Sequence, residues 1–186
     1  MKKTIIFSMV IILSVTLFAT AEKSREEKIK DCQPLLKESQ ELFQQNKVDA
    51  AIAKMKEAIK IVPDYHNFYS ILSYLYTQKK DYENQYLAAK KTVELYEAAK
   101  KRGEKKNMTD VFYMNLGAAA VNYSYALRQK KEYKKEVELL QAGLKSFKKF
   151  MELNKKGKFF NTAKEQADTI EKDLLPVAKK AAAAKK

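Results

Sequence analysis

The stretch QKKDY at residues 78–82 recurs 51 residues later as QKKEY at residues 129–133. A weaker copy, QNKV at residues 45–48, precedes residues 79–82 by 34. A serine precedes each stretch with the same two offsets, at Ser39, Ser73 and Ser124. Similarity at a fixed period of roughly 20–50 residues marks arrays of one small structural unit. The chain is therefore predicted to hold three similar units, of which the third is delayed by 17 residues.

Composition and apolar spacing favour helices along the whole chain. The 186 residues include only four glycines and three prolines, and strong helix formers such as Ala, Lys, Glu and Leu dominate. Apolar residues within 133–151 recur at spacings of four and three, which places them on one helical face. We therefore predict an all-α fold. The expected helices cover residues 32–46, 48–61, 66–79, 82–102, 109–130, 133–155 and 162–184.

A helix–turn–helix period of 34 residues resembles the tetratricopeptide repeat. Residues 69–76, YSILSYLY, are similar to that family's aromatic-x-x-Leu-Gly-x-x-Tyr signature, with Tyr for Trp and Ser for Gly. The chain departs from the family where alanines are usual, at Gln85, Thr92, Glu136 and Gly143. The resemblance implies an α-solenoid of about three stacked units closed by a capping helix. These parts would cover about residues 32–65, 66–108, 109–155 and 162–184.

The 17 additional residues fall between the second and third units, around residues 100–107. Because both flanks still favour helix, the simplest prediction lengthens two neighbouring antiparallel helices by about two turns each. The hairpin would then protrude, with its tip at residues 103–107, whereas a disordered insert is the alternative. Basic residues concentrate at this tip: Lys100, Lys101, Arg102, Lys105 and Lys106.

The last predicted helix has its own signals. Thr162 and Glu165 match a capping box at its start, and Pro176 should kink it because proline lacks a backbone donor. Its expected apolar face consists of Ala167, Ile170, Leu174 and Val177. A helix of this kind would seal the open end of a repeat stack.

The N-terminus has the three-part layout of a secretory signal peptide. Lys2 and Lys3 give a positive start, residues 4–18 are largely apolar, and small residues surround Ala21. The apolar stretch is shorter than the roughly 20 residues that span a bilayer. We expect cleavage after Ala21, which leaves a domain at residues 22–186 in the bacterial periplasm or outside the cell. An uncleaved anchor is the alternative.

The sequence offers little for catalysis. The only histidine, His66, is expected on the surface at a helix start, and no partner for a general base stands out. Neither a glycine-rich phosphate loop nor a Cys/His cluster with metal-ligand spacing is present, so we expect no cofactor and no metal. Cys32 is expected to be structural, with an intermolecular disulfide as the alternative. We predict a protein without enzyme activity.

Six of the eleven tyrosines divide into two groups. Those at core positions of the repeat are Tyr69, Tyr76, Tyr82 and Tyr133. Tyr74 and Tyr125 instead directly follow their unit's small serine, on the side that lines the concave groove in the tetratricopeptide family. The resemblance therefore implies a partner-binding groove, which would comprise Gln40, Phe43, Gln44, Ser70, Tyr74, Gln78, Val121, Tyr125, Arg128 and Gln129. In the alternative, the final helix fills this groove and buries Tyr74 and Tyr125.

These observations predict a non-catalytic, exported interaction scaffold that holds a peptide or a partner protein in its groove. Some family members clamp a peptide's C-terminal carboxylate, but only Asn122 fits that pattern here, so we expect no such clamp. The net charge of +14 supports an alternative, a cell-envelope surface binder that acts on anionic lipids or polymers. No nucleic-acid partner is expected. Groove binding should survive moderate salt, whereas charge binding should not.

Overall fold

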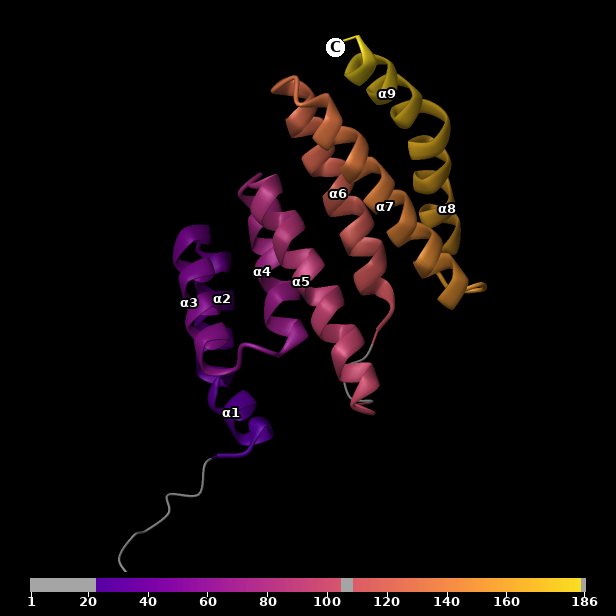
Figure 1. Cartoon of the computed structure of the whole chain (residues 1–186). Coiled ribbons are helices and arrows are strands. Elements are labelled where there is room, and N and C mark those ends of the chain that lie inside the picture. The colour runs from indigo at the N-terminus through magenta and orange to yellow at the C-terminus, as the bar shows by residue number, and fades with distance from the viewer. Residues whose placement is uncertain (1–22, 105–108, 185–186) are drawn as a thin grey trace, which may run out of the picture.

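The computed structural model describes residues 23–104 and 109–184, and it is all-α over that part of the chain. Figure 1 shows the order of the helices. Their bounds are α1 (Arg25–Asp31), α2 (Gln33–Gln44), α3 (Val48–Ile61), α4 (His66–Gln78), α5 (Tyr82–Lys101), α6 (Val111–Gln129), α7 (Tyr133–Leu153), α8 (Phe160–Thr169), the π-helical segment η2 (Ile170–Leu174) and α9 (Leu175–Ala183). Every expected helix is confirmed, with ends shifted by no more than two residues.

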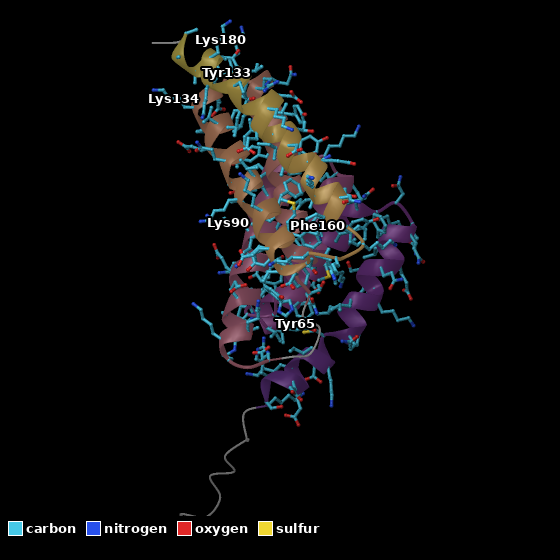
Figure 2. The ribbon with its side chains drawn as sticks, turned by 90° about the vertical axis from the view of Figure 1, so that its right-hand side faces the viewer. Tyr65, Lys90, Tyr133, Lys134, Phe160 and Lys180 are labelled. Atoms are coloured by element: carbon cyan, nitrogen blue, oxygen red, sulfur yellow. The ribbon has the colours of Figure 1, made fainter. Side chains whose placement is uncertain are left out.

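The helices pack in sequential antiparallel pairs (Figure 1). Helices α2 and α3, α4 and α5, and α6 and α7 form the pairs, while α3 packs on α4 and α5 on α6. The C-terminal segment packs on α7; in Figure 2, Phe160 and Lys180 mark its two ends. We call the surface carried by α2, α4 and α6 the first-helix face, and the surface carried by α3, α5 and α7 the second-helix face.

The turns inside the three pairs share one backbone geometry. Asn46, Lys80 and Lys131 have φ values of 58°, 59° and 58°. Such left-handed residues commonly end helices. The N–H of the following residue then bonds back across the helix end in each turn: Lys47 to the Leu42 carbonyl, Asp81 to that of Tyr76, and Glu132 to that of Leu127, at 2.9, 3.0 and 2.9 Å.

The small serines lie at the crossing inside each pair. The Ser39 hydroxyl donates to the Ala51 carbonyl at 3.0 Å, and the Ser73 hydroxyl donates to that of Gln85 at 3.1 Å. The third pair differs, because Ser124 donates to Val121 of its own helix at 2.7 Å. Buried small side chains let two helices approach closely, and the first two pairs add an interhelical hydrogen bond there.

Two regions of the core hold the stack together. One surrounds α2 to α4 and includes Cys32, which is fully buried, with its Sγ 3.8 Å from the Ala58 carbonyl. This burial confirms the structural role expected for Cys32. The other region joins α5, α6, α7 and the C-terminal segment. There a Cβ at Gly117 would lie 2.8 Å from the buried Phe147 ring, so a larger residue would force that ring to shift.

The lengthened hairpin of α5 and α6 is partly packed against its neighbours, whereas the sequence-based prediction had it protrude with its tip at residues 103–107. With 20 and 19 residues, both helices exceed the 13 residues of α4; in the added turns Tyr96, Ala99, Phe112 and Tyr113 are buried, while Lys100, Lys101 and Asn115 are exposed. The ring of Tyr96 lies 5.3 Å from that of Phe112 and 5.9 Å from that of His66. His66 begins α4 as expected, yet it is 1% exposed, so its surface placement was wrong. Aromatic packing between successive pairs explains both differences.

Ion pairs also fix the end of this hairpin to the N-terminal part of the chain. Arg25 of α1 reaches Asp64 at 2.8 Å and Glu104 at 3.3 Å, and Arg102 pairs with Glu104 at 2.7 Å. Residues 105–108, which include part of the predicted tip, lie outside the described residues. Helix α5 ends at Lys101 and α6 begins at Val111, and the alternative of a disordered insert stays untested at residues 105–108.

A π-helical segment changes the register of the C-terminal segment. Ala167 and Ile170 are buried as predicted, but Val177 is 57% exposed and Leu175 and Ala178 are buried instead. The π turn at Ile170–Leu174 adds one residue, so the apolar face moves from positions 174 and 177 to 175 and 178. The predicted capping box is also wrong, since α8 starts at Phe160 and Thr162 lies inside it.

The N-terminal segment α1 was not predicted. Ser24 and Glu27 form a capping box: the Ser24 hydroxyl accepts from the Glu27 N–H, and the Glu27 carboxylate accepts from the Ser24 N–H. Within residues 23–104 and 109–184, no helix is long and apolar enough to cross a membrane. The predicted signal peptide at residues 1–21 and its cleavage after Ala21 lie outside the described residues.

Candidate functional site

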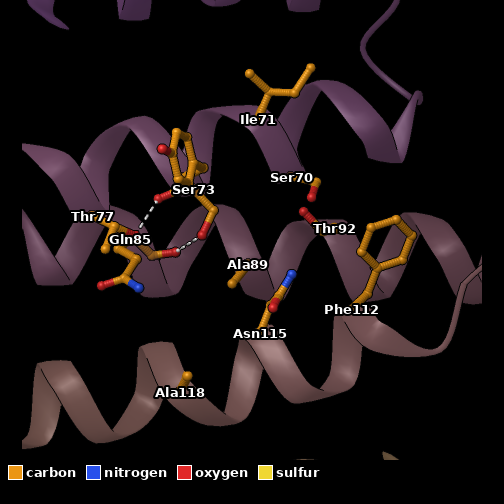
Figure 3. Close-up of a pocket in the computed structure, with 11 residues that line it drawn as sticks. Ser70, Ile71, Ser73, Thr77, Gln85, Ala89, Thr92, Phe112, Asn115 and Ala118 are labelled. Atoms are coloured by element: carbon orange, nitrogen blue, oxygen red, sulfur yellow. Dashed lines mark hydrogen bonds between the residues drawn. The ribbon is translucent and has the colours of Figure 1, made fainter. Parts of the chain in front are cut away.

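A pocket of about 400 Å³ opens on the first-helix face between α4 and α6, with α5 behind it (Figure 3). Its position follows from the pairing, because α5 packs on both α4 and α6 and leaves a gap between those two helices. The lining residues are Ser70, Ile71, Ser73, Tyr74, Thr77, Gln85, Ala89, Thr92, Phe112, Asn115 and Ala118.

The described residues that line this pocket are all uncharged, although 32% of the chain is charged. Hydrogen bonds inside the protein occupy several of their polar groups. Thr77 donates to the Ser73 carbonyl at 3.0 Å, and Thr92 donates to that of Ala88 at 2.9 Å. The amide of Asn122, one turn beyond Ala118, donates to the Gln85 side chain at 3.3 Å.

Other polar groups remain available to a ligand. Within the described part of the chain, the side chains of Ser70, Tyr74 and Asn115 form no hydrogen bond. In Figure 3, Asn115 extends from α6 toward α5, between the labelled Phe112 and Ala118. A hydroxyl, a phenol and an amide beside an aromatic ring offer neutral hydrogen bonds and apolar contact. A binding surface of this kind favours an uncharged ligand.

The predicted groove residues of the first two pairs lie on this face. Gln40, Gln44 and Gln78 are exposed, and Ser70 lines the pocket. Tyr74 is 54% exposed, and its ring meets that of Phe43 edge to face at 5.6 Å. This contact links α2 to α4 and holds the Tyr74 ring beside the pocket.

The third pair contributes differently from the prediction. Val121 is buried in the core, and Tyr125, Arg128 and Gln129 lie outside the pocket. Tyr125 is 44% exposed, with the Arg128 guanidinium 6.0 Å from its ring centroid. The pocket uses the other end of α6, which carries Asn115. Sequence reasoning missed Asn115, although its spacing of seven from Asn122 places both on one helical face.

Arg128 has a structural partner that the sequence-based interpretation overlooked. Its Nε and Nη2 lie 2.7 and 2.6 Å from Oε1 of Glu136, which is 1% exposed. Arg128 therefore neutralises a buried carboxylate, and its guanidinium is not available as a free contact for a partner. Glu136 occupies the position where the first two pairs have Ala51 and Gln85, whose carbonyls accept the serine hydrogen bonds.

The tyrosines predicted at core positions differ in their burial. Tyr76 is buried as expected, at 8% exposed, whereas Tyr69, Tyr82 and Tyr133 are half-buried. The alternative in which the final helix buries Tyr74 and Tyr125 is wrong, because both remain exposed and the C-terminal segment packs on α7. The pocket between α4 and α6 is therefore open.

Two residues of the basic tip, Lys100 and Arg102, are engaged within the protein. Lys100 lies 3.8 Å from Glu97 and 5.2 Å from the Tyr96 ring centroid, and Arg102 pairs with Glu104. Lys101 is exposed, whereas Lys105 and Lys106 lie outside the described residues. Burial raises the pKa of the Tyr96 phenol, which also donates to Asp110 at 2.6 Å. Burial likewise raises the pKa of Tyr113, whose hydroxyl bonds to Glu97.

No group of His, Cys, Asp and Glu side chains in the described ranges is arranged to hold a metal ion. No family model matches the chain, and no curated protein matches it. The site is therefore interpreted from its own residues and packing.

Proposed function

We propose that this protein is an exported, non-catalytic interaction scaffold of the tetratricopeptide type. Its three pairs share one turn geometry at Asn46, Lys80 and Lys131, with the offsets of 34 and 51 that relate the sequence copies. The serine hydrogen bonds of the first two pairs support the same relation. The segment α8–η2–α9 covers the outer side of α7, as a terminal cap would.

The proposed ligand is an uncharged stretch of a partner polypeptide, bound in the pocket between α4 and α6. The observation that carries this proposal is an open pocket with an uncharged lining, in which Ser70, Tyr74 and Asn115 keep hydrogen-bonding groups available. Backbone amides of a bound segment match such groups, and the exposed Tyr74 ring supplies apolar contact. Tyrosine is enriched among the residues that dominate binding energy.

Site-specific photo-crosslinking in the native cell envelope tests this proposal. A photoreactive phenylalanine analogue at Tyr74 should capture a partner protein, whereas the same analogue at exposed Val177 of α9 should not. With that partner purified, Tyr74→Ala and Asn115→Ala should each weaken binding at about 0.1 M and about 0.5 M salt alike.

The opposite result favours the alternative function. If binding is lost at the higher salt and its affinity is unchanged by both substitutions, the protein acts through its basic charge on anionic lipids or polymers. The net charge of +14 supports that alternative. The engagement of Lys100 and Arg102 in ion pairs argues against the hairpin end as its main contact.

A further inference from the structure

A second hollow lies on the second-helix face, between α5 and α7 with α6 as its floor. It measures about 730 Å³, which exceeds the pocket on the first-helix face. Apolar side chains form its floor and walls, among them Val93 of α5, Leu116 of α6 and Leu144 of α7. We call this hollow the outer groove.

The outer groove offers apolar contact and few hydrogen bonds. On the α7 side, Ala142 and Ser146 line the hollow, and their small side chains leave space there. The Ser146 hydroxyl already donates to the Ala142 carbonyl at 2.9 Å. An extended peptide would bring backbone groups that find few partners here, and unpaired buried groups are costly. A helix satisfies its own backbone and presents only side chains, so it suits this surface better.

The rim of the outer groove is positively charged. Lys148 pairs with Glu171 at 3.3 Å and Lys149 with Glu152 at 3.1 Å, so these two charges are partly offset. Lys90 and Lys145 are exposed and have no ion pair within the described part of the chain. Acidic side chains that flank an apolar stripe would meet these two lysines.

We propose that the outer groove binds an acidic amphipathic helix of a partner protein. The α7 wall runs from residue 141 to 152, which is about 17 Å, or about three helical turns. An acyl chain fits poorly, since the hollow is an open trough and small hydrophobic ligands are usually enclosed. A second copy of this basic chain would bring like charge. Binding in the outer groove does not depend on the proposed binding of a partner in the pocket between α4 and α6.

A designed peptide tests the groove directly. The probe is a fluorescein-labelled helical peptide of about 15 residues, with leucines on one stripe and glutamates beside it. A counterpart carries lysines in place of the glutamates. Fluorescence anisotropy should show the acidic peptide binding at least about tenfold more tightly than the basic one. Ala142→Trp should fill the groove and abolish binding, whereas Tyr74→Ala should leave it unchanged.

Charge reversal supplies the matched control. Lys90→Glu with Lys145→Glu should weaken the acidic peptide at least about tenfold and improve the basic one. Lys60→Glu with Lys179→Glu makes the same change in net charge elsewhere and should have little effect. Circular dichroism checks that each variant is folded.

Several outcomes would overturn the proposal. Equal weakening by the two charge-reversed pairs would mean that net charge alone attracts the peptide. Unchanged affinity in Ala142→Trp would place the peptide elsewhere. Binding of phosphatidylglycerol-containing vesicles that Ala142→Trp abolishes, without peptide binding, would assign the groove to lipid. A dimer in sedimentation equilibrium that the same substitution dissociates would assign it to a second copy.

Discussion

Arg128→Ala should destabilise this protein strongly, because it leaves the Glu136 carboxylate buried without a cation. Glu136 is 1% exposed, and both contacts from Arg128 fall on its Oε1, at 2.6 and 2.7 Å. Its Oε2 has no hydrogen-bond partner within the described residues. Removing one member of a buried pair typically costs about 3–5 kcal/mol. Arg128 is 30% exposed, so water can enter the vacated space, and we expect a loss of about 2–4 kcal/mol.

Urea unfolding followed by far-UV circular dichroism measures this loss, and a double-mutant cycle isolates the pair. Glu136→Ala restores the small residue that the first pair has at Ala51, so it should cost less than Arg128→Ala. The double variant should be more stable than Arg128→Ala alone, with a coupling energy of at least about 1.5 kcal/mol. Strictly additive losses, or a loss below about 0.5 kcal/mol for Arg128→Ala, would refute the reasoning. Arg128 would then be a surface residue without a structural role.

Other features lead to smaller, separate predictions. In thermal unfolding, Tyr74→Ala should cost less than about 1.5 kcal/mol and the buried Tyr76→Ala about 3 kcal/mol or more; equal losses would contradict an open first-helix face. Lys80→Gly should raise the free energy of unfolding by about 0.5–1 kcal/mol in urea titrations, since Lys80 holds a φ of 59° that favours glycine. Burial raises the pKa of Tyr96 and Tyr113, so the unfolded chain loses these protons first, near pH 10. The free energy of unfolding should therefore decrease as the pH rises above about 10. In Tyr96→Phe this decrease should be less steep than in the wild type.

The helix positions could be predicted because they depend on local patterns. Apolar spacing and the repeated turn stretches located each expected helix within two residues of its bounds. Register within a unit also placed Tyr74 on an exposed face, as observed. The segment α1 could also have been predicted, since Ser24 and Glu27 form a capping box that can be recognised in the sequence.

Features that depend on contacts between distant segments could not be predicted in the same way. His66 is buried by Tyr96 and Phe112, which lie 30 and 46 residues further along the chain. The π turn that exposes Val177 has no simple sequence signal. The Arg128 ion pair did have a sequence signal: by the offsets, Glu136 stands at the position of the buried Ala51, and a buried carboxylate requires a cation nearby.

The added turns of α5 and α6 build the surfaces on both faces of the stack. By the offset of 34, residues 96–101 extend α5 beyond the counterpart of α3, and by the offset of 51, residues 111–116 extend α6 beyond the counterpart of α4. Phe112 and Asn115 of this segment line the pocket between α4 and α6, while Tyr113 and Leu116 line the outer groove. Residues 96–101 bring Tyr96, which joins Phe112 and His66 in the contact between the pairs. The insert that the sequence suggested to be a projection therefore contributes to the core, to the lining of the pocket between α4 and α6 and to the floor of the outer groove.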